Sequence, residues 1–267
     1  MAKPLRKFDA AGATRMERMY ASAPIVEQRV RTRALLALKA GERGLEIGCG
    51  VGFLACEMAR EIGSNGRIAC LDNSPDMIAA AQKRAEREGV ADRLQFVVGD
   101  ATKLDFPSGS FDFVVAVQVY LYVADIERAL AEAARVLKRD GRLVIVDTDW
   151  DSCVWLTSDR ERHERIMEAR LREFGQPHLP PALPRLLQRA GLDLIEVEAY
   201  PVLNLRYDED SFSAGLIDST PKIVTQFGIG ATEADAWLKD LKSRSADGDY
   251  FFSLNRYLFL ARPLKEA

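Results

Sequence analysis

A glycine-rich turn that follows a short apolar strand constrains this chain more than any other feature. The apolar run 44–47 leads into Gly48, Gly50 and Gly52, and an amphipathic helical pattern begins directly after them. Because glycine has no Cβ, the backbone can turn sharply here and a ligand can lie directly against it. Three glycines alone are weak evidence. Their position between a strand and a helix predicts a ligand-binding loop in an α/β fold.

Four further short segments have the same apolar pattern as the first strand, and segments with a helical pattern separate them. They are nearly continuous in apolar residues, as parallel strands buried on both faces should be. The five expected strands cover residues 44–47, 67–71, 94–98, 111–117 and 142–146. Helices are expected from Pro75 to the residue before Gly89 and over 130–137. This alternation predicts an α/β fold with a doubly wound, mostly parallel sheet.

The chain of 267 residues suits one large domain, and its formal net charge of −3 leaves no overall positive field for nucleic acid. We therefore expect no nucleic-acid partner. The spacing of the four cysteines matches no zinc site, so we expect no metal. The sequence contains no apolar run of about 18 residues, nor an N-terminal signal sequence, so we expect no membrane partner and a cytoplasmic location with free thiols.

Two carboxylates stand where further strands are expected to end. Asp72 follows the second strand about 20 residues after the glycines, and Asp100 follows the third. The carboxyl ends of parallel strands meet at one edge, so both acids can border a nucleoside there, with Asp72 accepting ribose hydroxyls. Each acid alone could equally be a helix cap. A nicotinamide dinucleotide site is the rival prediction, but its last two glycines are three positions apart, whereas Gly50 and Gly52 are two apart.

Five segments together resemble the class I S-adenosylmethionine-dependent methyltransferases, in the branch of the ubiquinone and menaquinone biosynthesis enzymes and many natural-product enzymes. The resemblance covers about residues 25–150. It implies a Rossmann-like methyltransferase fold with a seven-stranded sheet and a reversed final hairpin, which residues 192–199 and 250–261 would supply. The matching segments are Leu45-Glu46-Ile47-Gly48-Cys49-Gly50-Val51-Gly52, Leu71-Asp72-Asn73-Ser74-Pro75-Asp76-Met77, Gly99-Asp100-Ala101, 106–112 and 135–143.

The resemblance also implies which residues contact S-adenosylmethionine as cofactor. Those expected to bind it are Tyr20, Arg29, Gly48, Cys49, Gly50, Asp72, Asn73, Met77, Asp100, Ala101 and Gln118. For Arg29, a solvated helix face is an equally good interpretation. The chain departs from the family in two places. It has no histidine after the fourth strand, where many relatives carry one, and Val117-Gln118-Val119-Tyr120 stands where enzymes that methylate amide or exocyclic nitrogens have an Asn/Asp-Pro-Pro-Tyr loop.

The remainder of the chain is expected to elaborate this domain. We expect a helical segment at 1–40 and the cofactor-binding domain at 41–267, with helical cap insertions at about 150–191 and 200–249. These insertions are longer than ordinary connections between secondary-structure elements, and such long segments often cover a functional site. Trp150, Trp155 and Tyr207 are aromatic residues available there for an acceptor, although they could simply pack the cap.

Two polar residues fall on the apolar face of a charged helix within the first insertion. At 100° per residue, His163 and Arg170 share a face with Ile166, Met167 and Phe174. We predict catalytic roles for both, His163 as a proton acceptor and Arg170 as a binder of a carboxylate or phenolate. The alternative is a core histidine, and an arginine paired with an acid such as Asp149 or Asp151.

The predicted function is methyl transfer from S-adenosylmethionine to an O, N or C nucleophile of a small molecule. A methyltransferase acting on RNA or protein and a non-catalytic binding protein on the same fold remain as alternatives. The sequence leaves a homodimer open.

Overall fold

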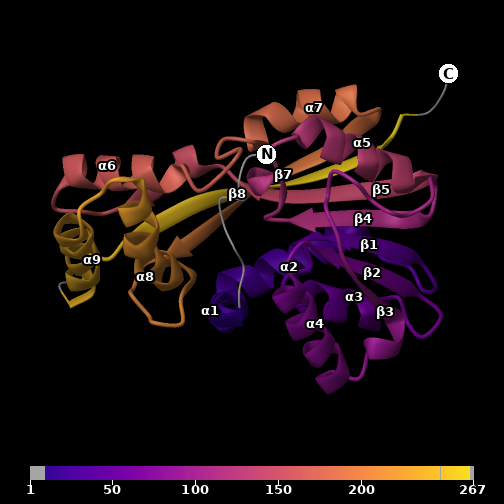
Figure 1. Ribbon diagram of the computed structural model, residues 1–267, viewed down its shortest axis with the longest axis horizontal. Helices are drawn as coiled ribbons and strands as arrows, with labels where there is room; N and C mark the ends of the chain where they lie inside the picture. Colours follow the sequence, from indigo (N-terminus) through magenta and orange to yellow (C-terminus); the bar gives the residue numbers. More distant parts are fainter. Residues whose placement is uncertain (1–9, 247, 265–267) are drawn as a thin grey trace.

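The computed structural model describes residues 10–246 and 248–264, which form one mixed sheet covered by helices (Figure 1). Residues 1–9 of the expected N-terminal segment lie outside this range. The helices are α1 (Ala10–Ala21), α2 (Ala23–Leu36), α3 (Phe53–Glu61), α4 (Pro75–Arg87), α5 (Ile126–Val136), α6 (Arg160–Leu171), α7 (Leu183–Arg189), α8 (Phe212–Val224) and α9 (Ala231–Ala246). The strands are β1 (Arg43–Ile47), β2 (Arg67–Asp72), β3 (Leu94–Val98), β4 (Phe111–Val117), β5 (Leu137–Thr148), β6 (Val154–Trp155), β7 (Leu192–Asn204) and β8 (Phe252–Pro263).

The strand order is β3-β2-β1-β4-β5-β8-β6, and β7 also pairs with β8. Strands β1 to β5 are parallel, whereas β8 runs antiparallel to β5, β6 and β7. The predicted mostly parallel sheet with a reversed final hairpin is therefore confirmed. The short strand β6 adds an eighth strand that the sequence did not predict.

Helices cover both faces of the sheet. Side chains of α2, α3 and α4 pack into one hydrophobic core, and those of α5 and α7 pack into the other. Local sequence explains where several helices begin. In α4, the Ser74 hydroxyl accepts the Met77 N–H and Pro75 opens the first turn, while Asp125 accepts the Arg128 N–H at the start of α5.

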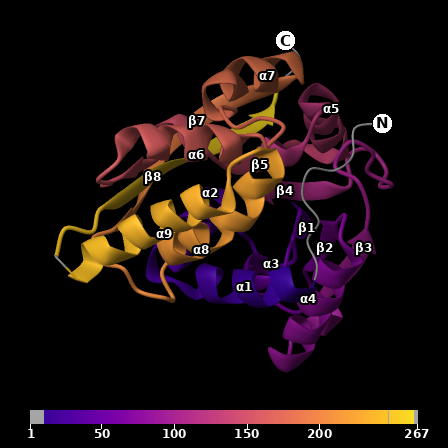
Figure 2. The same ribbon diagram turned by 60° about the vertical axis from the view of Figure 1, so that its left-hand side comes forward.

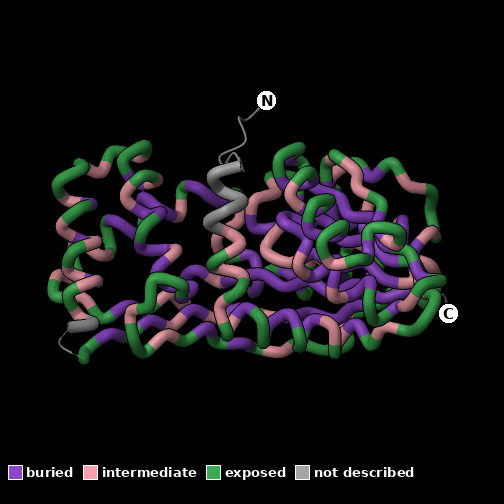
Figure 3. Tube along the Cα trace, turned by 90° about the horizontal axis from the view of Figure 1, so that it is seen from below, coloured by how far each residue is buried: buried purple, intermediate pink, exposed green. Residues whose placement is uncertain are grey.

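A helical lobe, composed of α6, α8, α9 and the far ends of β7 and β8, extends from one end of the sheet (Figure 1). Helix α8 packs against both α6 and α9. Helix α7 instead packs against β7, so the end of the first expected insertion covers the sheet rather than this lobe. Helix α1 contacts α4, which covers the sheet, as well as α8 of the lobe, and thus connects the two (Figure 2). Figure 3 shows buried positions continuing from the sheet into the lobe.

Among the described residues, no helix is both long and apolar enough to cross a membrane.

Candidate active site

A cavity of about 480 Å³ lies along the carboxyl ends of the parallel strands and continues toward the helical lobe. Its size is typical of small-molecule sites, which span about 300–1,000 Å³. The strand order places the ends of β3, β2, β1 and β4 side by side, followed by β5 and β8. All eleven predicted cofactor-binding residues line this cavity, as does Arg170. The structure therefore brings together residues that are up to 150 positions apart in the sequence.

The glycine loop is held against the end of β2. The Gly48 and Cys49 N–H groups donate to the Leu71 carbonyl, at 2.6 and 3.0 Å. Gly48, Gly50 and Gly52 all have positive φ, a region that favours glycine. A Cβ built on Gly48 would lie 2.3 Å from Cγ2 of Val119, so the loop has no room for a side chain there.

Asp72 organises the loops on either side of it. One carboxylate oxygen accepts the Gly50 N–H and the other accepts the Ser74 N–H, both at 2.9 Å. Burial raises the pKa of this carboxyl, although the backbone donors oppose the shift. Asp100 lies one strand further along and is exposed at the rim, where it accepts two hydrogen bonds from Thr102. Both acids thus occupy the edge that the sequence predicted.

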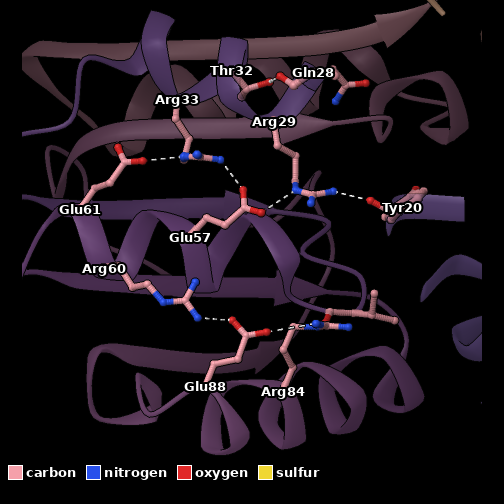
Figure 4. Close-up of polar contacts among 11 residues, drawn as sticks. Tyr20, Gln28, Arg29, Thr32, Arg33, Glu57, Arg60, Glu61, Arg84 and Glu88 are labelled. Atoms are coloured by element: carbon pink, nitrogen blue, oxygen red, sulfur yellow. Dashed lines mark hydrogen bonds and ion pairs between the residues drawn. The ribbon is translucent and has the colours of Figure 1, made fainter. Parts of the chain in front are cut away.

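Arg29 is buried, so the solvated-face interpretation of this residue is wrong. Its Nε donates to Glu57 at 2.9 Å and its Nη1 donates to the Tyr20 carbonyl at 2.6 Å (Figure 4). The guanidinium also lies 4.8 Å from the centre of the Phe53 ring. Arg29 therefore links α2 and α3 to the end of α1 beside the glycine loop.

Glu46 lies on β1 directly before the glycine loop and was not among the predicted site residues. It is buried, and burial together with the Glu57 and Asp72 charges raises its pKa well above the ordinary value. Within the described part of the chain, its Oε2 has no hydrogen-bond partner. A buried acceptor without a partner at a cavity wall suits a ligand that brings a donor, such as an amino group.

Gln118 adopts a left-handed backbone conformation with φ of 57°, which is unusual for a residue other than glycine. Its side chain is held by β5, where Oε1 accepts the Thr148 hydroxyl at 2.7 Å and Nε2 donates to the Val146 carbonyl at 3.3 Å. Strained backbone of this kind concentrates at functional sites. Gln118 thus stands between the glycine loop and the lobe, in a fixed orientation.

Of the two residues predicted to be catalytic, Arg170 lines the cavity and His163 does not. Arg170 is 1% exposed, lines the cavity and lies 5.4 Å from the Trp150 ring. Its carboxylate partner is Glu173 at 3.8 Å rather than Asp149 or Asp151. His163 is not among the residues that line the cavity. It packs between Trp155 and Trp237, and its Nδ1 accepts the Trp237 indole N–H at 3.0 Å.

These contacts favour a packing role for His163, and the pH dependence of stability tests it. Burial lowers the pKa of His163 below 6.5, so protonation is less favourable in the folded state than in the unfolded state. Its stabilisation is therefore present above pH 6.5 and is lost as the pH falls. We expect the unfolding free energy, from urea titrations at about pH 7 and pH 5, to fall less in His163→Gln than in the unmodified chain. An unchanged pH dependence together with lost methyl transfer would favour a catalytic role.

Comparison with known proteins shows that this chain is similar to methyltransferases. Residues 45–145, which hold the glycine loop and both strand-end acids, match the methyltransferase domain model. Residues 45–145 form a methyltransferase domain. The chain is 32% identical over 164 residues to the methyltransferase GfsG of Streptomyces halstedii, covering 61% of this chain and 56% of GfsG. It is 34% identical over 116 residues to the ubiquinone/menaquinone biosynthesis C-methyltransferase UbiE of Pseudomonas putida, covering 43% of this chain and 45% of UbiE.

A solved structure shares the fold over nearly the whole chain. Phosphoethanolamine N-methyltransferase 2 of Haemonchus contortus, in complex with S-adenosyl-L-methionine, has a TM-score of 0.63 at 20% identity, covering 97% of this chain and 58% of that protein. The predicted Rossmann-like methyltransferase fold is confirmed. The chain spans less than two thirds of the length of the curated relatives it matches first.

Proposed function

We propose that this protein is an S-adenosylmethionine-dependent methyltransferase that acts on a small molecule. The observation that carries the proposal is the continuity of one cavity, which joins the glycine loop and the strand-end acids to a lobe lined by aromatic and basic residues. The first half has the features of a nucleoside site. The second half offers space for an acceptor beside it.

The residues of the first half fit the cofactor. We infer that Gly48, Cys49 and Gly50 take its methionine part through backbone atoms and that Asp72 takes its ribose. Asn73, Met77, Asp100 and Ala101 would hold the adenine, Gln118 would stand near the sulfonium, and Tyr20 and Arg29 would close the methionine end. Glu46 is added to this set because its unpartnered oxygen suits the cofactor's amino group. When bound, S-adenosylmethionine supplies a methyl group on a positively charged sulfur, which an O, N or C nucleophile accepts.

The chain contributes mainly alignment and exclusion of water. Gln118 is fixed by two hydrogen bonds to β5, and the buried Arg170 beside Trp150 would orient the acceptor. Positioning and desolvation can supply much of the rate enhancement in such a transfer, so a strong base is not required. We keep Arg170 as the proposed catalytic residue. We leave His163 out because the His163 ring contacts Trp155 and Trp237.

The helical lobe serves as the cap in this proposal. Arg170 of α6 and Phe212, Leu216 and Ser219 at α8 line the cavity, so the lobe would form the acceptor wall. The buried free thiols of Cys49, Cys56 and Cys70 fit the reducing cytoplasm that we propose as its location. Cell fractionation would test that location.

A labelling experiment separates a small-molecule acceptor from the RNA and protein alternatives. Lysate from cells that lack the enzyme is divided by ultrafiltration into small molecules, total RNA and protein, and each fraction is incubated with the purified chain and S-adenosylmethionine labelled in its methyl group. We expect label in the small-molecule fraction only, because the negative net charge disfavours polyanions. Transfer into RNA or protein would contradict the proposed acceptor class. Binding of S-adenosylmethionine with no transfer into any fraction would favour the non-catalytic alternative.

A further inference from the structure

Arg256 on β8 is a buried cation at the lobe end of the cavity. It lines the cavity, is 3% exposed, and lies opposite Thr148 in the register of β5 and β8. Its Nη1 donates to Oε1 of Gln28, and its guanidinium lies 4.7 Å from the Phe212 ring. Within the described part of the chain, its Nε has no hydrogen-bond partner.

The protein compensates this charge incompletely. Burial lowers the pKa of Arg256 to about 10, which leaves the side chain charged at neutral pH. The acid whose charge acts on it is Asp147, which is fully buried, and burial raises the pKa of Asp147 well above its usual range. A buried cation held mainly by one amide oxygen and a ring face is costly unless another anion completes its environment.

The surroundings of Arg256 indicate what that anion is attached to. Trp150 stacks on Phe174 with ring centres 4.8 Å apart, and Tyr122 lies 5.3 Å from Phe174. All three rings line the cavity. Two further arginines line the cavity, and each has a carboxylate nearby: Glu57 lies 2.9 Å from Arg29, and Glu173 lies 3.8 Å from Arg170. The cavity therefore combines aromatic walls with a buried cation, Arg256, that the described residues compensate incompletely. This combination matches an aromatic body carrying a carboxylate better than a phosphate dianion.

The strand order also indicates where such a ligand would lie relative to Gln118. Gln118 follows β4, its side chain bonds to Thr148 at the end of β5, and Thr148 faces Arg256 on β8. Two strand spacings separate β4 from β8, which is about 10 Å. A molecule of one aromatic ring whose carboxylate contacts Arg256 would thus extend toward Gln118 and the proposed methyl donor.

We propose that Arg256 binds the carboxylate of the methyl acceptor, so that the substrates are small aromatic carboxylic acids. This inference rests on the proposed function, because it names the acceptor of the same site. Gln28 acts as the neutral partner that positions the guanidinium without cancelling its charge.

Calorimetric titration of the chain saturated with S-adenosylhomocysteine tests the proposal. The probes are three matched pairs: benzoate and benzamide, 4-hydroxybenzoate and 4-hydroxybenzamide, and cinnamate and cinnamamide. We expect at least one acid to bind tenfold or more tightly than its amide, and Arg256→Gln to reduce that ratio to near one. Arg262→Gln, on an exposed position of the same strand, is the matched control and should leave the ratio unchanged.

A second variant keeps the test decisive if Arg256→Gln fails to fold. Gln28→Glu retains the size of the side chain and places a carboxylate on the Arg256 guanidinium, so it should also abolish the preference for the acid. Equal binding of acids and amides, or no binding of any acid while S-adenosylhomocysteine still binds, would overturn the inference. Failure of the unmodified chain to bind S-adenosylhomocysteine would instead count against the proposed function.

Discussion

Replacing Asp72 with alanine is expected to lower the affinity for S-adenosylhomocysteine by roughly 10- to 150-fold. This range corresponds to the loss of about 1.5–3 kcal/mol for a buried, charge-assisted hydrogen bond. Asp72 is 8% exposed, and its carboxylate accepts the N–H groups of Gly50 and Ser74. Its loss removes the proposed ribose acceptor and also frees the glycine loop from the start of α4. Isothermal calorimetry with S-adenosylhomocysteine measures the effect.

Asp76→Ala provides the control for this experiment. Asp76 is an exposed acid in the first turn of α4, on the same segment as Asp72. Its removal changes the net charge equally but breaks no contact with the glycine loop, so the affinity should stay within about twofold. If Asp72→Ala binds S-adenosylhomocysteine as tightly as the control does, the cofactor assignment at this strand end is wrong.

The convergence of the proposed cofactor-binding residues on one cavity could be predicted from the sequence because its determinants are local. Continuous apolar runs fix buried parallel strands, and each strand end then places its acid on the same edge of the sheet. Asp72 and Asp100 border the cavity for this reason. The positive φ angles of Gly48, Gly50 and Gly52 are likewise the backbone property that makes glycine informative in a sequence.

The proposed acceptor half of the cavity was harder to predict because it depends on packing between distant segments. The helical pattern correctly placed Arg170 on the buried face of α6. A helical wheel does not reveal what faces each position, however, and His163 faces two tryptophans instead of the cavity. Arg256 was missed because a charge inside a long strand carries no local signal. Its proposed role emerges only from the register that sets it opposite Thr148.

Replacing Gly48 with alanine is expected to destabilise the fold by about 2–5 kcal/mol and to abolish measurable cofactor binding. The left-handed conformation, with φ of 71°, costs a residue that has a Cβ roughly 1–2 kcal/mol. The new methyl group would also lie 2.3 Å from Val119, and overpacking of this kind costs a further 1–3 kcal/mol. Relief of the clash would displace the Gly48 N–H from the Leu71 carbonyl and shift the backbone proposed to contact the cofactor. Urea unfolding and calorimetry measure the two effects.

Gly63→Ala separates the two causes, because Gly63 has nearly the same φ, 72°, with nothing within 4 Å of an added Cβ. It should cost only the conformational part, roughly 1–2 kcal/mol, and should leave cofactor affinity unchanged. In the double variant Gly48→Ala, Val119→Ala, most of the contact is removed, so part of the stability and of the binding should return. If Gly48→Ala were no more destabilising than Gly63→Ala and still bound the cofactor, the close approach of Val119 would not shape this loop. The tight fit between the loop and the end of β4 would then have no part in holding the cofactor.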